Sequence, residues 1–493
     1  MINIPEVKLG IVAVSRDCFP VELSKKRQEK VVKKCSEAKI SLIQIDSLVE
    51  NENDAVKALK EIKEKNINAL VVYLGNFGPE GPSTLLAESF DGPCMFAAAA
   101  EEPDNNLIQD RGDAFCGLLS ASYNMGLRSI YPYIPEKPVG TDEQVVNMIR
   151  DFIPIARTVL GIRNLKIFSF GPRPQDFYAC NAPIKPLYDL GVEIMENSEL
   201  DLYDIYKKAE GSPEIKEITK EMTEELGQGN QYPDLLEKLA QYEAALRKFY
   251  KDNLGASQYG AFANKCWPAF ESYFGFVPCY VNSRLASDGI PVACEVDIYG
   301  ALSEFMAACA TKYPSTLLDI NNNVPEKLFN RSIKKTENYK LDDLFMGFHC
   351  GNTASCYLKE PKMKYQLIMN RLLEKGNEPD ITRGTLEGQI RPGEVTIFRL
   401  QSTADNQLKC YIAEGEVLDV DPHSFGCIGV FGIKEMARFY RHVLIEKRFP
   451  HHTVVAFKHT GSILFEAAKL LGIEDIGFNQ PKNRLYEREN PFK

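Results

Sequence analysis

The chain has 493 residues and a formal net charge of −10 at pH 7. This length is too great for a single hydrophobic core and predicts about two to four domains. The acidic balance argues against a nucleic acid or an anionic membrane surface held by bulk electrostatics, while a local cationic pocket for a small substrate stays compatible with it.

The N-terminal stretch MINIPEVKLGIVAVSRD lacks the basic start, apolar middle and cleavage site of a signal peptide. Apolar runs such as NALVVYLG are far shorter than the ~20 residues of a membrane-spanning helix. The 13 cysteines contain no C-x-x-C pair, which favours reduced thiols over a cysteine-bound zinc ion. We therefore expect a cytoplasmic protein without a membrane partner.

The N-terminal part of the chain alternates between strand and helix patterns. Strands are predicted over residues 7–14, 40–47 and 67–75, with amphipathic helices over residues 21–39 and 52–66. In such β-α-β sheets ligands gather at the carboxyl ends of the strands, here the loops SRDCF and GNFGPEG. Neither loop has the G-x-G-x-x-G spacing of a dinucleotide site.

A second strand-and-loop unit begins near residue 160, where LKIFSF leads into the loop GPRPQDFY, and GVEIMEN supplies a further strand. Residues 198–256 have helical spacing rich in Glu, Lys and Leu and are interpreted as solvated helices. From about residue 311, short strand patterns separated by turns predict a mostly β domain. The fold class predicted is α/β, with two doubly wound, Rossmann-like domains at 1–160 and 161–310 and a β-rich C-terminal domain at 311–493.

Four segments carry acids or histidines in apolar or Gly/Asn-rich surroundings. They are PVACEVDIYGAL with Glu295, PSTLLDINNN with Asp319, LFMGFHCGN with His349, and FPHHTVVAF with His451 and His452. Carboxylates and imidazoles together suit a borderline divalent ion such as Mn²⁺. The segments are too far apart to form a local metal motif, so buried side chains satisfied by ordinary hydrogen bonds are the alternative.

Asp297 and one histidine of the adjacent pair His451 and His452 are expected to have a structural role and not to belong to the site. Asp297 follows Glu295 by two positions, and residues i and i+2 on a helix do not face the same way. Adjacent side chains on an extended segment point to opposite faces, so at most one residue of the pair His451 and His452 is expected to reach a given site.

At these segments the chain resembles the L-fucose isomerase and L-arabinose isomerase superfamily over most of residues 5–475. The resemblance implies Glu295 and Asp319 as metal-ligating carboxylates and His452 as a third ligand. His349 matches an additional histidine ligand of the arabinose-isomerase branch, which the fucose-isomerase branch does not use. His451 is expected to support the site or to bind substrate.

The resemblance also implies an assembly and a chemistry. Members form trimers or hexamers with active sites between domains and subunits, so a neighbour is expected to contribute loops such as GNFGPEG or EEPDNN. They interconvert aldoses and ketoses through an ene-diol, which assigns proton transfer to Glu295 and Asp319 without deciding which is the base. No cofactor beyond the divalent ion is expected, because isomerisation involves no net oxidation.

Substrate specificity is the least determined property. We expect a neutral pentose or deoxyhexose of the L-fucose, D-arabinose or L-arabinose type. Arg16 matches a substrate-contacting arginine of the fucose-isomerase branch, and a surface arginine is its alternative. If Arg16, Arg173 and Lys265 converge, the pocket suits an anionic sugar, as in the isomerisation of sulfoquinovose to sulfofructose. Trp267 is either a sugar-stacking ring or a packed interface aromatic.

A hypothesis from another class is a non-catalytic sugar-binding protein that uses the two α/β domains as a hinged clamp. The acids and histidines favour an enzyme instead. The two hypotheses differ in whether Mn²⁺ switches on ketose formation or a sugar only stabilises the protein.

Overall fold

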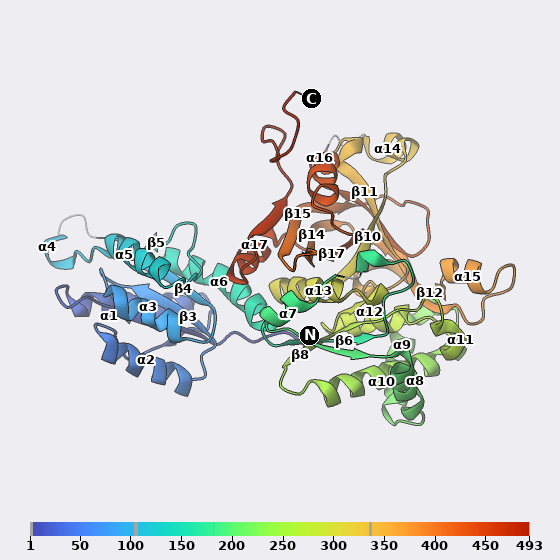
Figure 1. Cartoon of the computed structure of the whole chain (residues 1–493), viewed down its shortest axis with the longest axis horizontal. Coiled ribbons are helices and arrows are strands. Elements are labelled where there is room, and N and C mark those ends of the chain that lie inside the picture. Colours follow the sequence, from blue (N-terminus) through green and yellow to red (C-terminus); the bar gives the residue numbers. More distant parts are fainter. Residues whose placement is uncertain (1–2, 103–106, 181, 335–337, 493) are drawn as a thin grey trace. The chain divides into compact units, whose positions relative to one another are not determined.

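The structure is a computed structural model that describes residues 3–102, 107–180, 182–334 and 338–492 (Figure 1). Its internal contacts divide the chain into two compact units. The first comprises residues 1–4, 161–468 and 473–493, and the second comprises residues 5–160 and 469–472. The division into three domains stays a prediction. No helix among the described residues is long and apolar enough to cross a membrane.

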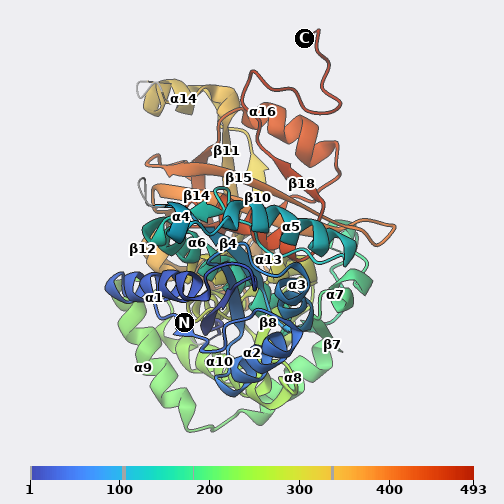
Figure 2. The same cartoon turned by 90° about the vertical axis from the view of Figure 1, so that its left-hand side faces the viewer.

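The unit of residues 5–160 is built on a parallel sheet with the strand order β2-β1-β3-β4-β5. Its central strands are completely buried, as continuous apolar runs in a covered parallel sheet should be. Helices surround the strands (Figure 2). The elements are β1 Leu9–Val14, α1 Val21–Glu37, β2 Ile43–Gln44, α2 Glu52–Glu64, β3 Ala69–Leu74, α3 Glu80–Ser89, β4 Cys94–Ala99, α4 Leu107–Asp110, α5 Ala114–Leu127, β5 Val139–Gly140 and α6 Asp142–Ile162.

A second parallel sheet with the order β7-β6-β8-β9 opens the other unit. Figure 1 shows β6 and β8 between α13 on one side and α8 and α10 on the other. The elements are β6 Leu165–Phe170, α7 Lys185–Asp189, β7 Glu193–Asn197, α8 Glu199–Lys208, α9 Glu214–Leu226, α10 Leu236–Asn253, β8 Tyr259–Ala263, α11 Phe270–Phe274, α12 Cys279–Ser287, β9 Val292–Ala293 and α13 Ile298–Thr311.

The C-terminal part of this unit is a nine-stranded mixed sheet with the order β12-β13-β16-β11-β10-β17-β14-β15-β18. An additional pairing of β15 with β16 closes the strands from β16 to β15 into an antiparallel ring. The strands are β10 Ser315–Asn322, β11 Leu344–His349, β12 Leu358–Tyr365, β13 Arg383–Ile390, β14 Gly393–Ser402, β15 Leu408–Leu418, β16 Cys427–Gly432, β17 His452–Ala456 and β18 Asp475–Phe478, and the helices are α14 Glu326–Ser332, α15 Leu367–Leu373, α16 Met436–Phe439 and α17 Gly461–Leu470.

The predicted fold class is confirmed. Both parallel sheets with their helices are Rossmann-like, and the large mixed sheet supplies the β-rich C-terminal part. One hydrophobic core extends from β6 and β8 through α10 and α12 to β14, β15 and β16. The second parallel sheet and the strand ring therefore share a core and hold a common boundary, and the candidate site lies there.

Candidate metal centre

Glu295 is placed by an unusual backbone turn at the carboxyl end of β9. Glu295 and Val296 both have φ of 55°, between the end of the strand and the start of α13. A positive φ is uncommon outside glycine and is unfavourable for a β-branched residue such as valine. Residues in this backbone region cluster at functional sites, where the surrounding structure holds them in place. Here the Val296 N–H donates to the carbonyl of Asn264 at the end of β8.

The strand ring brings Asp319 and His452 together. Asp319 on β10 pairs in register with His452 at the start of β17 and, on its other side, with Phe348 on β11. Residues directly opposite each other in an antiparallel pair project to the same face. His349 follows Phe348 as the last residue of β11.

The side-chain atoms converge at distances that exceed hydrogen bonds. His452 Nε2 lies 3.3 Å from Glu295 Oε2 and 3.5 Å from Asp319 Oδ1. His349 Nε2 lies 3.6 Å from Glu295 Oε2. Ligand bonds of about 2.0–2.2 Å to one ion space adjacent ligand atoms about 3.0–3.5 Å apart, whereas N–H···O hydrogen bonds measure about 2.7–3.2 Å.

Two of these atoms lack any hydrogen-bond partner among the described residues. Glu295 Oε2 and His452 Nε2 are both buried and unsatisfied. Because buried polar atoms are almost always paired, an unsatisfied oxygen facing an unsatisfied nitrogen indicates a missing partner. Two carboxylates and one imidazole are a donor set that borderline divalent ions accept. These residues therefore fit a divalent ion.

Behind His452 lies a buried carboxylate and guanidinium pair. Asp297 Oδ2 accepts from His452 Nδ1 at 2.7 Å, and Arg399 donates to both oxygens of Asp297 at 2.5 and 2.8 Å. A carboxylate can only accept, so Nδ1 of His452 carries a proton, which leaves Nε2 as the ring nitrogen that can face an ion. Burial opposes the charge on Asp297, but Arg399 and His452 outweigh it and hold the pKa of this carboxyl well below its ordinary value.

The structural interpretation of Asp297 missed this contact. The positive φ of Glu295 and Val296 breaks the helical register on which that interpretation depended, and Asp297 instead caps α13 through Gly300 N–H. Arg399 and Cys180, whose Sγ lies 3.7 Å from His452 Nδ1, were also missed. The available signal for Arg399 was a charged residue inside the apolar run VTIFRL, which β14 buries at every position from Val395 to Ser402.

The two adjacent histidines have different environments. His452 is 1% exposed and His451 is 39% exposed. His451 Nε2 nevertheless lies 3.7 Å from Asp319 Oδ1. Burial, followed by the neighbouring His452, lowers the pKa of His451. Both imidazoles thus approach Asp319, but only His452 also faces Glu295.

The loops after β6 and β8 carry the residues assigned to substrate. The Arg173 guanidinium stacks on Tyr178 with 4.1 Å to the ring centroid, and its buried Nε has no hydrogen-bond partner. Lys265 is 8% exposed, and its Nζ lies 3.4 Å from Glu199 Oε2. In the described part of the chain neither Arg173 nor Lys265 bonds to the acids and histidines. They follow β6 and β8, which belong to the same parallel sheet as β9, and β8 pairs directly with β9.

An aromatic row connects these loops to the acids and histidines. Trp267 packs edge-on against Phe177 at 5.6 Å between ring centroids, and Phe177 packs against His451 at 5.9 Å. Arg16 belongs to the other unit, where it follows β1, its N–H donates to Asn76 Oδ1 and its guanidinium lies over Phe77. The roles of Arg16 and of the other substrate residues stay predictions.

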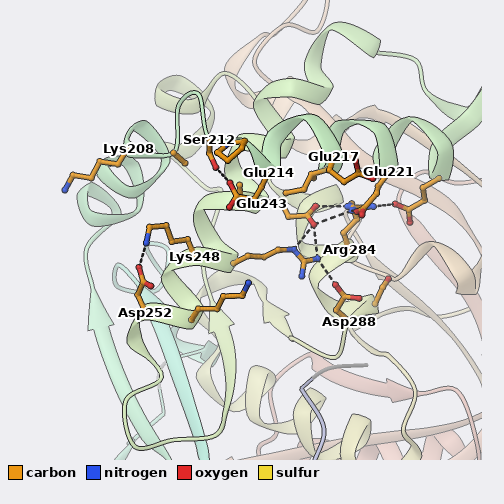
Figure 3. A pocket seen from close by; sticks show the side chains of 18 residues that line it. Lys208, Ser212, Glu214, Glu217, Glu221, Glu243, Lys248, Asp252, Arg284 and Asp288 are labelled. Atoms are coloured by element: carbon orange, nitrogen blue, oxygen red, sulfur yellow. Dashed lines mark hydrogen bonds and ion pairs between the residues drawn. The ribbon is translucent and has the colours of Figure 1, made fainter.

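A pocket of about 990 Å³ lies elsewhere, beside α9 and α10 (Figure 3). Its charges neutralise one another. Arg284 is bound by Glu221, Glu225 and Glu243, and Arg247 bridges Glu243 and Asp288. None of the acids and histidines of the candidate centre lines this pocket. We therefore interpret this pocket as a surface feature lined by internal ion pairs and not as a substrate site.

Two family models match the chain. Residues 10–163 match the fucose/sulfoquinovose isomerase N-terminal domain, and residues 347–477 match the L-fucose isomerase C-terminal domain. The chain therefore belongs to the fucose isomerase-like superfamily, which confirms the resemblance seen in the sequence. The fucose isomerase family is metal-dependent, and the described residues include groups such as Asp319, His451 and His452 that are close enough to share an ion.

Curated relatives from three bacteria match over part of their length, and all three are named sulfoquinovose isomerase. The protein of Alkalicoccus urumqiensis is 27% identical over 308 residues, covering 60% of this chain and 61% of the relative. That of Priestia aryabhattai is 24% identical, covering 65% and 66%. That of Clostridium sp. strain MSTE9 is 26% identical, covering 56% and 57%. The chain thus spans less than two thirds of these relatives.

The relatives overturn one prediction. We expected a neutral pentose or deoxyhexose, and this is wrong, because all these relatives bear the name of an isomerase for the anionic sugar sulfoquinovose. The prediction of a neutral sugar depended on the resemblance at the acid and histidine segments, which concern the expected metal site and proton transfer and carry no information about the sugar.

Proposed function

We propose that the protein is a metal-dependent aldose-ketose isomerase for an anionic sugar, with sulfoquinovose and sulfofructose as the pair suggested by the relatives' names. The observation that carries the proposal is the position of His452 Nε2, which lies 3.3 Å from Glu295 Oε2 and 3.5 Å from Asp319 Oδ1. Glu295 Oε2 and His452 Nε2 are both buried without a hydrogen-bond partner among the described residues. Proton transfer between adjacent carbons needs a base beside a group that stabilises developing negative charge. This centre supplies both.

Glu295, Asp319 and His452 hold the ion in this proposal, and the donor set favours Mn²⁺. A divalent ion bound there would stabilise negative charge on the carbonyl and hydroxyl oxygens of the sugar. One of the two carboxylates removes the proton from the carbon beside the carbonyl, and the other serves the neighbouring position. Asp297 and Arg399 keep His452 in the required tautomer.

The anionic group of the sugar is assigned to Arg173 and Lys265. Both follow strands of the parallel sheet that also presents Glu295, so their loops lie at the same edge. Arg173 retains an unpaired buried Nε, and Lys265 is nearly buried with one long contact to Glu199. A sulfonate would satisfy both cations. Trp267 and Phe177 offer apolar surface for the sugar ring.

The test is an isomerisation assay on the purified chain with Mn²⁺, using sulfoquinovose, glucose as the equivalent sugar without a sulfonate, and L-fucose. We expect sulfofructose by NMR from sulfoquinovose alone. Arg173→Ala and Lys265→Ala should raise KM strongly, because leaving one partner of a buried charge pair costs about 2–5 kcal/mol. Stabilisation by sulfoquinovose without turnover would indicate the sugar-binding protein instead.

We also propose that the chain assembles through α5. Phe115, Leu119, Tyr123 and Leu127 follow at intervals of four residues and are 62 to 69% exposed. The helix AFCGLLSASYNMGL carries no charge. Its two aromatic rings alone expose roughly 200–300 Å². With the leucines the patch exceeds the few hundred Å² that monomers expose, and it suits the centre of an interface of about 800 Å² per partner.

We assign a second copy of this chain as the partner of α5. The exposed face of this helix is uncharged and alternates large and small residues, so it can pack against the same face of another copy. The small residues Ser122 and Gly126 lie on the same exposed face, and the open space beside Gly126 leaves room for a large side chain of a second copy. Such a contact builds dimers and hexamers but not trimers alone. Of the loops expected at a subunit contact, GNFGPEG follows β3, while residues 103–106 of EEPDNN lie outside the described residues.

Sedimentation velocity tests this interface. Leu119→Lys and Leu127→Lys should shift the chain to a smaller species, since each places a charge in an apolar contact. Val56→Lys is the matched control, because Val56 is 60% exposed on α2 of the same unit. A wild type that sediments as a monomer would contradict the proposal.

A further inference from the structure

Lys265 and Glu199 form an ion pair across the carboxyl edge of the second parallel sheet. Lys265 follows β8, Glu199 opens α8 directly after β7, and the strand between β7 and β8 is β6. Lys265 Nζ lies 3.4 Å from Glu199 Oε2. A pair between residues that follow β7 and β8 spans the end of β6, where the loop that carries Arg173 begins.

Glu199 packs on the first residue of that loop. Gly171 has φ of 86°, and a side-chain carbon built on it would lie 3.0, 3.1 and 3.2 Å from Cγ, Oε2 and Cδ of Glu199. The N–H of Gly171 donates to the carbonyl of Asn197 at 2.7 Å, which joins this loop to the turn before α8. The glycine therefore leaves room for a carboxylate next to the loop of Arg173.

The two partners of the ion pair differ in exposure. The Lys265 side chain is 7% exposed, whereas that of Glu199 is 41% exposed. A nearly buried ammonium is costly without a counter-charge. Within the described residues Glu199 is the one acid that forms an ion pair with Lys265. Glu199 thus supplies a negative charge at the edge of the subsite to which the anionic group of the sugar is assigned.

These side chains set the charge that an anionic substituent meets. The positive charges of Arg173 and Lys265 and the negative charge of Glu199 leave a single positive charge. The other acid of the Arg173 loop, Asp176, is exposed, where solvent screens it. A sulfonate carries one negative charge and neutralises the subsite. A phosphate ester carries about −1.5 to −2 at pH 7 and would bring excess negative charge beside Glu199.

We propose that Glu199 is a specificity-determining residue, which restricts the subsite of Arg173 and Lys265 to singly charged sugars and excludes sugar phosphates. This inference rests on the proposed function, which assigns these two cations to the anionic group of the substrate. A glucose 6-phosphate molecule has the ring of sulfoquinovose and an anion on the same carbon, with one bridging oxygen added. Shape therefore separates the two sugars poorly, and a repulsive charge separates them better.

A purely structural role is the alternative for Glu199. An acid in the first turn of a helix is stabilised by the helix dipole, and Glu199 is the first residue of α8. A structural carboxylate affects all sugars alike, whereas a selective one affects them according to their charge. Because Glu199 is partly exposed, solvent screens it, and we expect its removal to change the selectivity by about tenfold.

Initial rates of the purified full-length chain with Mn²⁺ test the inference on sulfoquinovose, glucose 6-phosphate and glucose 6-sulfate. Glucose 6-sulfate has the bridging oxygen and the size of glucose 6-phosphate but one negative charge. We expect the wild type to prefer glucose 6-sulfate to glucose 6-phosphate. In Glu199→Gln the kcat/KM for glucose 6-phosphate relative to glucose 6-sulfate should rise about tenfold, mainly through KM. A ratio measured within one variant does not depend on how much of that variant is folded.

Glu214→Gln is the matched control, because Glu214 is the first residue of α9 as Glu199 is of α8. It removes the same charge at the same helix position and should keep the wild-type ratio, as should Glu199→Asp, which keeps the charge. An unchanged ratio in Glu199→Gln, or a wild type that treats glucose 6-sulfate and glucose 6-phosphate alike, would overturn the inference and leave the proposed function intact. A wild type that does not isomerise sulfoquinovose would instead refute the proposed function.

Discussion

Replacing Asp297 by asparagine probes both the stability and the chemistry of the buried pair behind His452. Asp297 is 1% exposed and Arg399 is completely buried. Removing one partner of a buried ion pair leaves an uncompensated charge and costs about 3–5 kcal/mol. Asparagine caps helices about as well as aspartate, so the bond to Gly300 N–H should persist. The cost therefore measures the charge and not the cap.

The same substitution should change the tautomer of His452. If the asparagine N–H₂ group faces Nδ1, it donates where the carboxylate accepted, and the ring proton moves to Nε2. The lone pair that faces Glu295 is then lost. We expect Mn²⁺ affinity or activity to fall about 10- to 100-fold, the usual effect of removing a group that orients a ligand.

Urea unfolding followed by circular dichroism, at matched protein concentration, measures the stability change. Arg399→Met in the Asp297→Asn background removes the orphaned charge, so the double variant should regain more than half of the loss. An Asp297→Asn variant within about 1 kcal/mol of the wild type, or a double variant that loses the sum of both single effects, would refute the reasoning.

Three further predictions concern other carboxylates. Asp319→Asn should abolish turnover while leaving the circular dichroism spectrum unchanged, and retained turnover would remove Asp319 from the centre. Burial, and then Asp297, raise the pKa of Glu304 to about 8. The native state therefore holds a proton that the unfolded state releases between about pH 4.5 and 8, and stability falls as pH rises through this window. Glu304→Gln should accordingly raise Tm at pH 8 but not at pH 4.5, and an equal shift at both would contradict the assignment. Burial opposes the charge of Glu61, but bonds from Lys65 Nζ and from the N–H groups of Asp46 and Ser47 lower its pKa to about 2. Its stabilisation is present above about pH 4.5 and is lost as pH falls towards 2, so Glu61→Gln should lower Tm at pH 7 and flatten the acid limb of the Tm profile.

Local sequence patterns were sufficient to predict several of the strands. The predicted strand over residues 67–75 contains β3, and the short strand patterns predicted after about residue 311 correspond to strands such as β13, β14 and β15. The strand predicted over residues 40–47 is reduced to Ile43–Gln44 at the edge of its sheet, where only one neighbour can hold it. Periodicity detects burial, and an edge strand is buried less.

Local sequence patterns could not predict that the strands close into a ring, or that Asp297 and Arg399 lie behind His452. Asp319 pairs with His452 across more than a hundred residues, and nothing in either segment specifies its partner. The interpretation of Asp297 failed because it assumed helical geometry at a residue pair that has positive φ. An arginine inside an apolar strand, such as Arg399, is visible in the sequence, but its partner Asp297 becomes recognisable only from the three-dimensional arrangement of β14 and α13.

The closed strand ring constrains some parts of this unit much more than others. Each strand that carries an acid or histidine of the centre is hydrogen-bonded on both sides, so a shift by one residue would turn every side chain of that strand to the other face. Insertions there are not tolerated without losing the centre. The loops after β6 and β8, by contrast, lie outside the strand pairings, and loops tolerate changes of length and composition better than paired strands do. Under the proposed function, changes in these two loops can therefore alter which sugar is bound, while the strands that hold the acids and histidines stay unchanged.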